Sequence, residues 1–193
     1  MAKRALKTIL RGAFLTVAFP LAAAAGFGRW ASPYTAFAHL CALAPGTLGD
    51  YLRIAFYRLT LTECSLSSRI SFGSFFAHSE AKLGPNVYIG SYCVIGKAVI
   101  GKGVQIASGV QILSGNRQHA RNEEGEISGA EEGVFRTVTI GDQCWIGAAA
   151  IVMADVGPGT TIGAGSVVSR PIAPHSVAVG SPARVIRPKT AHS

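Results

Sequence analysis

Aliphatic residues recur at every sixth position through most of the chain from about residue 70 onward. Leu83, Ile89 and Ile95 form the first clear series. Three later series are displaced from it by short steps: Ile100, Ile106 and Ile112; Val134, Ile140, Ile146 and Val152; and Val156, Ile162 and Val168. Self-similarity at a short fixed period marks a solenoid, because one such segment cannot bury its side chain alone. The strands of a β-sandwich would alternate with period two, so we predict an all-β solenoid.

Glycine follows the aliphatic residue at many of these positions, for example in Ile89-Gly90, Ile140-Gly141 and Ile162-Gly163. We expect glycine to allow the sharp turn at each corner of a coil. Three six-residue segments make one triangular coil, and stacked coils share one aliphatic column. Stacking pairs the backbone edges of the coils, so that just the two ends need a cap.

Residues 1–62 form a separate, apolar and basic helical segment in this prediction. Lys3, Arg4, Lys7 and Arg11 precede an apolar run over residues 13–27, which Pro20 interrupts. Four interpretations compete: a cleaved signal, a membrane span, an interfacial helix on the cytoplasmic leaflet, or a structural cap. Basic residues ahead of an apolar run favour the interfacial helix, with contact to the membrane through residues 1–45.

A capped amphipathic helix is predicted over residues 45–62, where Leu52, Ala55, Phe56 and Leu59 share one face. Asp50 is the expected N-cap. Two arginines of this helix, Arg53 and Arg58, are expected to stay in solvent.

The balance of charge and the cysteines restrict the classes of partner. A net charge of +8 and a pI near 9.7 suggest an anionic partner. Nucleic acid is disfavoured, because the chain has no dense basic run and no nucleic-acid-binding motif. Cys41, Cys64, Cys93 and Cys144 lie far apart without zinc spacing, so we expect buried reduced thiols and no metal.

The repeat is interrupted over residues 113–133 by a polar loop that holds five of the ten acidic residues of the chain. An insertion of this length into a regular solenoid is usually functional or disordered. The loop carries His119, which by itself could be an ordinary surface residue. His78 lies at the entry to the coils, where a structural role is favoured over a catalytic one.

From about residue 83 to residue 188 the chain resembles the hexapeptide-repeat acyltransferases, among them the maltose, galactoside and exopolysaccharide O-acetyltransferases. Three segments carry the resemblance: Ile-Gly-Asp-Gln-Cys-Trp-Ile-Gly at 140–147, Ile-Gly-Ala-Gly-Ser-Val-Val at 162–168, and Val-Gly-Ser-Pro-Ala-Arg-Val-Ile-Arg at 179–187. The resemblance implies a left-handed parallel β-helix over residues 63–188, with residues 189–193 as a tail. It also implies a homotrimer with active sites between subunits.

The resemblance assigns roles to single residues. His119 matches the histidine base that removes the proton of the attacking hydroxyl. Glu131 or Glu132 could hold its tautomer, and backbone N–H groups could stabilise the oxyanion. Trp145 packs beside the site or is a surface aromatic of the coils, and His78 is a further supporting candidate.

Acetyl-CoA is the acyl donor that the resemblance implies. Its phosphates would meet Arg184, Arg187 and Lys189. Its pantetheine arm would run along the backbone at Ala148 and Ala164 and at the turn formed by Gly180, Ser181, Pro182 and Ala183.

The sequence therefore predicts a cytoplasmic enzyme at the inner face of the membrane that acetylates a sugar hydroxyl, in exopolysaccharide or surface-glycan biosynthesis. Direct transfer is expected, and an acyl-cysteine at Cys144 is disfavoured. Acetylation of an amino sugar and a non-catalytic binding scaffold are the alternatives.

Overall fold

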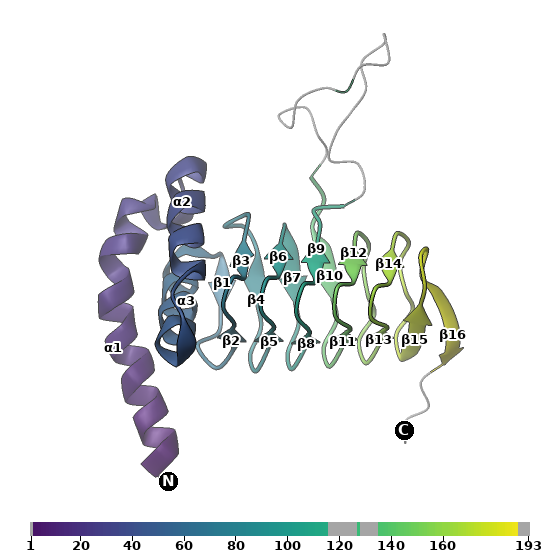
Figure 1. Ribbon diagram of the computed structural model, residues 1–193, viewed down its shortest axis with the longest axis horizontal. Coiled ribbons are helices and arrows are strands. Elements are labelled where there is room, and N and C mark those ends of the chain that lie inside the picture. The colour runs from purple at the N-terminus through teal and green to yellow at the C-terminus, as the bar shows by residue number, and fades with distance from the viewer. Residues whose placement is uncertain (1, 116–126, 128–134, 189–193) are drawn as a thin grey trace.

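The computed structural model describes residues 2–115, 127 and 135–188, and Figure 1 shows helices at one end and stacked coils at the other. The helical part consists of α1 (Ala2–Ala24), the short 3-10 helix η1 (Gly26–Gly28), α2 (Ala31–Ala42) and α3 (Gly46–Thr60). The first strand begins at Glu63, directly after α3.

The coils form three parallel sheets, which we name A, B and C in the order in which the chain visits them. Sheet A holds β1 (Glu63–Cys64), β4 (Lys82–Leu83), β7 (Ala98–Ile100) and β10 (Val138–Ile140). Sheet B holds β2 (Arg69–Ile70), β5 (Tyr88–Ile89), β8 (Gln105–Ile106), β11 (Trp145–Ile146), β13 (Thr161–Ile162), β15 (Ser176–Val179) and β16 (Arg184–Pro188). Sheet C holds β3 (Phe75–Phe76), β6 (Val94–Ile95), β9 (Gln111–Ile112), β12 (Ile151–Val152) and β14 (Val167–Val168). Isolated bridges at Val156 and Ile172 continue sheet A, and β16 pairs antiparallel with β15 at the last coil.

The sixfold aliphatic series forms the interior column, as predicted. In sheet B, Ile70, Ile89, Ile106, Ile146 and Ile162 lie in register from coil to coil and are buried. Sheets A and C repeat this arrangement with their own aliphatic columns. The residue before each interior position points outward, which is why a two-residue strand suffices for each side of a coil. The predicted all-β solenoid is confirmed for the described residues.

The glycine that follows an interior residue has a different role from the one we expected. At Gly90 and Gly147 the backbone φ is not positive, and the constraint is space. A Cβ at Gly147 would lie 2.4 Å from the backbone nitrogen of Ala164 in the next coil. The left-handed residue of the corner lies two positions further on, for example Gly109 or Ala149. Glycine is therefore needed for the close approach of neighbouring coils.

The three corners of a coil differ in how strictly their length is kept. From sheet A to B and from B to C, interior residues are always six positions apart, as in Leu83, Ile89 and Ile95. From sheet C to A the spacing varies: it is seven after Phe76, five after Ile95 and four after Val152. The long insertion after Ile112 leaves the coils at this same variable corner. We call this edge of the solenoid the C–A edge.

Helix α3 closes the first coil through a buried arginine, contrary to our expectation of a solvated one. Arg53 is fully buried, and its guanidinium donates to the carbonyls of Ile70 at 2.9 Å and Ala44 at 2.7 Å. Asp50 accepts from Arg53 at 2.6 Å and from Arg69 at 2.7 Å. The prediction of Asp50 as N-cap was wrong, because α3 begins at Gly46 and the carboxylate is used for these two ion pairs. A buried charge is stable when paired and hydrogen-bonded in this way.

Two tyrosines complete the cap by satisfying the backbone of the first coil. The hydroxyl of Tyr57 accepts from the backbone nitrogen of Phe76 at 3.1 Å, and that of Tyr34 donates to its carbonyl at 3.0 Å. Both side chains are buried. The end of a stacked sheet exposes unpaired backbone groups, and here the helices pair them.

Helix α1 packs on α3 and forms the outermost layer at this end (Figure 1). Its inner face buries the small residues Ala18 and Ala22. Among the described residues, no helix has the length and apolar character that a membrane crossing requires.

Candidate active site

The insertion is anchored at the C–A edge by residues on both of its sides. Ser114, before it, is buried, and its hydroxyl accepts from the backbone nitrogen of Lys97 at 2.9 Å. Arg136, after it, donates its backbone N–H to the Ser114 carbonyl at 2.9 Å and pairs with Asp155 at 2.5 Å. The chain therefore leaves and returns at adjacent points of the rigid coils.

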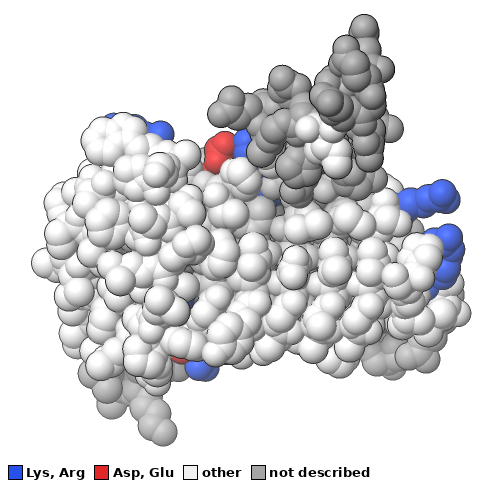
Figure 2. Space-filling model, turned by 45° about the horizontal axis from the view of Figure 1, so that its top comes forward, with Lys and Arg blue, Asp and Glu red and all other residues white. Residues whose placement is uncertain are grey.

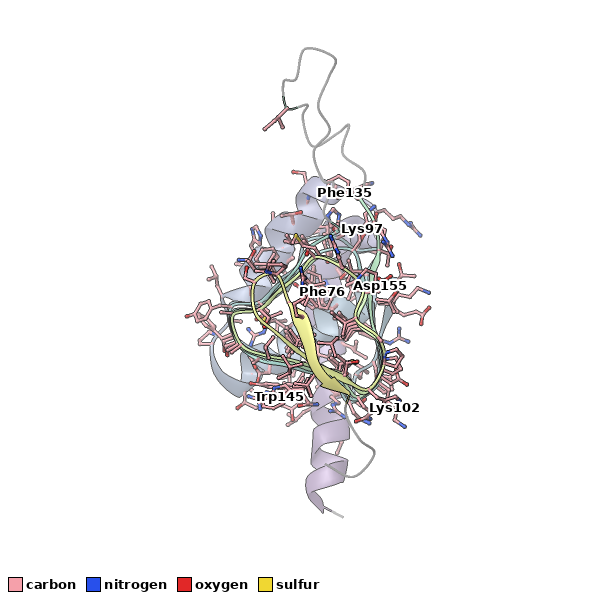
Figure 3. All side chains as sticks on the ribbon, turned by 90° about the vertical axis from the view of Figure 1, so that its right-hand side faces the viewer. Phe76, Lys97, Lys102, Phe135, Trp145 and Asp155 are labelled. Atoms are coloured by element: carbon pink, nitrogen blue, oxygen red, sulfur yellow. The ribbon has the colours of Figure 1, made fainter. Side chains whose placement is uncertain are left out.

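Aromatic and charged side chains gather beside these anchors. The ring of Phe135 lies 5.4 Å from that of His78, centroid to centroid, and the Lys97 ammonium lies 5.8 Å from the Phe135 centroid. Lys97 also pairs with Glu80 at 2.9 Å. Figure 3 shows Lys97 and Phe135 together at this edge. In Figure 2 acidic and basic side chains meet on a face that is otherwise largely uncharged.

The environment of His78 favours the neutral imidazole. Burial lowers its pKa, Glu80 opposes this and Lys97 adds to it, with a net downward shift. For Glu80, burial raises the pKa, but the hydrogen bond from Lys97 and the charges of Lys97 and His78 outweigh it, so that the net shift is downward. At neutral pH this edge therefore presents an uncharged imidazole beside an ion pair.

A pocket of about 340 Å³ lies between the helical cap and this edge. It is lined by Gly28, Arg29, Ala31, Tyr34, Ala77, His78, Ser79 and Glu80. The mixture of a guanidinium, a carboxylate, an imidazole and a hydroxyl suits a polar ligand.

Several residues predicted for catalysis lie outside the described residues, namely His119, Glu131 and Glu132. The described residues on either side of the insertion, Ser114 and Phe135, lie at the edge that carries His78. Among the described residues, Glu80 supplies a carboxylate beside His78. The sequence analysis did not identify it. Lys97 and Phe135 were also missed, since they lie 19 and 57 positions after His78 in sequence and no motif links them.

The residues predicted to contact the acyl donor share one edge of the solenoid, between sheets B and C. Ala148 and Ala164 lie in successive corners of this edge and are exposed, and the Ala148 carbonyl accepts from Gly165 at 2.8 Å. The turn of Gly180, Ser181, Pro182 and Ala183 forms the next corner, tied to the coil below by the hydrogen bond from the Ala183 nitrogen to the Val167 carbonyl at 2.8 Å. We call this edge the B–C edge.

The B–C edge fits an extended ligand. Its corners carry small, exposed residues, and a Cβ at Gly165 would meet nothing within 4 Å. The backbone is therefore open along several coils. Arg184 and Arg187 belong to β16 at the end of this edge, and the Arg184 side chain is exposed. Lys189 lies outside the described residues.

In a single chain, Trp145 does not lie at the C–A edge or the B–C edge. It is 58% exposed on the outer surface of sheet B, between Gln105 and Thr161. In Figure 3 it lies on the opposite side of the coils from Lys97 and Phe135. One chain therefore does not bring Trp145 to the C–A edge.

The four cysteines are buried, as predicted. Burial raises the pKa of Cys41 to about 11 and that of Cys64 to about 12, so that both stay protonated at neutral pH. The Cys144 thiol donates to the Gly157 carbonyl at 3.1 Å inside the coils. A buried thiol in this position cannot reach a thioester in solvent.

Two family models match the coils on either side of the insertion. Residues 80–114 match the bacterial transferase hexapeptide (six repeats), and residues 137–170 match the hexapeptide repeat of succinyl-transferase. The coils thus carry the hexapeptide repeats of these transferase families. The resemblance predicted from the sequence is confirmed.

Relatives similar to part of this chain bear the name "putative acetyltransferase". One from Schizosaccharomyces pombe is 40% identical over 46% of this chain and 42% of its own length. One from Staphylococcus aureus strain MRSA252 is 44% identical over 36% of this chain and 32% of its own length. One from Saccharomyces cerevisiae is 38% identical over 56% of this chain and 56% of its own length. The chain thus spans about half or less of the length of these relatives.

Solved structures share the fold. A maltose O-acetyltransferase from Clostridium difficile 630 has a TM-score of 0.70 at 24% identity, covering 83% of this chain and 87% of that one. A galactoside acetyltransferase in complex with coenzyme A has a TM-score of 0.59 at 22% identity, with 81% and 80% covered. The predicted fold class, a left-handed β-helix with an N-terminal helical segment, is confirmed.

Proposed function

We propose that the protein is an acetyl-CoA-dependent O-acetyltransferase that acts on a sugar hydroxyl in the synthesis of an exopolysaccharide or surface glycan. One observation carries the proposal: sheet C is bordered by the B–C edge, with Ala148 and Ala164, and by the C–A edge, from which the segment with His119 leaves. The residues predicted for the acyl donor and the point where the insertion leaves the coils thus border the same sheet, which supports the proposal. The acetyltransferase names of the relatives agree with this assignment.

The proposed reaction is a direct acyl transfer. His119 takes the proton of the hydroxyl while the hydroxyl oxygen attacks the thioester carbonyl. The carbon–sulfur bond then breaks, the acetyl ester forms, and the histidine returns the proton to the departing thiolate. Backbone N–H groups stabilise the negative oxygen of the intermediate. An ester product and free coenzyme A balance the reaction.

The rest of the proposal concerns the surroundings of the reaction. The chain forms a homotrimer, in which a neighbouring subunit brings Trp145 to the site. Arg184, Arg187 and Lys189 hold the phosphates of the donor. The enzyme acts in the cytoplasm at the inner face of the membrane, where acetyl-CoA and glycan precursors meet.

The test is thiol release from acetyl-CoA over a panel of oligosaccharide acceptors. We expect acceptor-dependent release that falls at least about 100-fold in His119→Ala, the range in which general base catalysis contributes. His175→Asn is the matched control, because His175 is exposed, and asparagine tolerates its positive φ of 52°. Equal loss in both variants, or no release with any acceptor, would reject the assignment of the base.

The product separates the oxygen acceptor from an amine acceptor. Acetyl esters are cleaved by neutral hydroxylamine, whereas acetamides are stable. We expect the radiolabelled product to lose its acetyl group under this treatment. A stable product would instead support N-acetylation of an amino sugar. Failure of acetyl-CoA to bind would leave the coils as a binding scaffold.

A further inference from the structure

The N-terminal part of the chain has an extreme charge bias. No acidic residue occurs before Asp50, while five basic residues do: Lys3, Arg4, Lys7, Arg11 and Arg29. The helical cap that these residues build therefore carries positive charge with little internal compensation. Such a surface attracts an anionic partner and repels a second copy of itself.

Between residues 12 and 24, helix α1 has no charged residue on either of its faces. Its inner face, with Ala18 and Ala22, is buried against the rest of the cap. Its exposed positions between residues 12 and 24 hold no charged residue: Gly12, Ala13, Thr16, Val17, Phe19, Pro20 and Ala24. A helical segment without charge on either face normally has a second apolar surface against it. Since α1 is the outermost layer (Figure 1), that second surface is not part of the described chain.

Exposed aromatic rings gather where α1 meets α2. The rings of Phe19 and Phe27 lie 5.6 Å apart, centroid to centroid, and Phe27 is 39% exposed. Trp30 is 61% exposed, and its ring covers Gly26, where a Cβ would lie 2.7 Å from it. Tryptophan and phenylalanine beside basic residues are the composition of helices that lie at a membrane interface.

We propose that the cap face, formed by Ile9, Phe19, Phe27 and Trp30, docks on the surface of an anionic lipid bilayer. The aromatic and aliphatic side chains enter the headgroup region, and the basic residues pair with lipid phosphates. The surface lies on the bilayer without crossing it, in keeping with the helix lengths of the described chain. Two copies of this face would bring like charges together, which disfavours a dimer as its occupant.

This docking places the candidate site beside the membrane, and in this respect it rests on the proposed function. Gly28 and Arg29, next to the aromatic cluster, line the same pocket as His78 and Glu80. A bilayer on the cap face therefore lies close to the C–A edge. The acceptor class that this arrangement fits is a saccharide on a lipid carrier, whose phosphate can meet Arg29.

The experiment is flotation of the full chain with vesicles of phosphatidylcholine alone or with 30% phosphatidylglycerol. The test variant combines Phe19→Gln, Phe27→Asn and Trp30→Ser. Asparagine tolerates the φ of 52° at Phe27, and serine suits the N-cap position that Trp30 holds in front of α2. The control is Ile186→Ser, which removes a 62% exposed aliphatic side chain at the far end of the coils.

We expect the wild type and Ile186→Ser to float with anionic vesicles, less at high salt and less without the anionic lipid. The triple variant should lose at least about tenfold of this partitioning. It should keep its thermal unfolding midpoint and its turnover of a soluble acceptor.

The inference is overturned if the wild type does not float, if the triple variant floats equally well, or if zwitterionic vesicles serve as well as anionic ones. A drop of the molar mass in solution for the triple variant would also overturn it, because the face would then join copies of the chain. Docking without any acetyl transfer would contradict the proposed function and leave the lipid surface standing.

Discussion

The ring of Phe135 faces the imidazole of His78 at 5.4 Å, and this contact joins the returning end of the insertion to the second coil. Phe135 is the first described residue after the insertion, and its ring contacts the coils at His78. This contact and the backbone hydrogen bond of Arg136 to Ser114 fix the described chain on both sides of the insertion.

Shortening Phe135 should impair catalysis more than folding. We expect Phe135→Ala to lower turnover about 10- to 100-fold, because a small displacement of the proposed base would have effects of this size. Phe135→Leu keeps most of the bulk and should lose much less. Thiol-release kinetics on both variants test this, with circular dichroism to verify the fold. Equal turnover of Phe135→Ala and the wild type would contradict the role of the contact.

His78 should make stability depend on pH in a defined window. Its pKa is lowered from 6.5 in the folded chain, so the unfolded chain binds a proton first as the pH falls. The folded state is fully favoured above about pH 6.5 and loses stability below it, until the pH passes the folded pKa. Glu80 titrates below this window, because its pKa is lowered from 4.5.

We expect the unfolding midpoint of the wild type to fall more between pH 7.5 and 5.5 than that of His78→Gln, measured at one protein concentration. Parallel pH profiles of the two proteins would show that His78 does not titrate differently on folding.

Arg53 should dominate the stability of the helical cap. Arg53→Met removes the hydrogen bonds of a buried guanidinium to four backbone carbonyls and a paired charge, so we expect a loss of about 3–5 kcal/mol. Arg58→Met changes an exposed arginine of the same helix and should stay within about 0.5 kcal/mol. Denaturant unfolding of both variants measures the difference. Similar midpoints for the two would mean that the carbonyls find other partners.

Replacing glycine by alanine should lower the stability of the chain at Gly147 and raise it at Gly12. Gly147→Ala places a Cβ 2.4 Å from the Ala164 backbone, and we expect a loss of about 2 kcal/mol or more. Gly12→Ala lies on the exposed side of α1 with nothing within 4 Å, so it should add about 0.5–1 kcal/mol. Thermal unfolding distinguishes the two. A neutral Gly147→Ala would show that neighbouring coils can separate without loss.

The sequence determined the coils well because their physics is periodic. Each interior residue, such as Ile89 or Ile146, meets the same environment one coil on, so a single pattern predicts many contacts. The cap was harder to predict. Arg53 was assigned to solvent because its neighbours in sequence gave no sign of the carbonyls of Cys41 and Ile70, which reach it through the fold.

The residues of the candidate site likewise divide into those that the repeat predicted and those that it did not. Ala148 and Ala164 could be placed on one edge because they occupy equivalent positions in consecutive repeats. Glu80 and Lys97 could not, since they lie at corners whose lengths differ and the period gives no register for them. Pattern reasoning fails where the repeat itself is broken, and that is where the polar groups gather.

Because the corners at the C–A edge vary in length, residues can be added there without disturbing the stacking of the coils. Because the other two corners alone keep the strands in register, residues added at the C–A edge change neither the buried column nor the pairing of the coils. A peptide grafted between Ser169 and Pro171, at the same edge two coils further on, would emerge on the same side of the molecule as the natural insertion. The scaffold can thus accept new recognition elements one edge at a time, without a new fold.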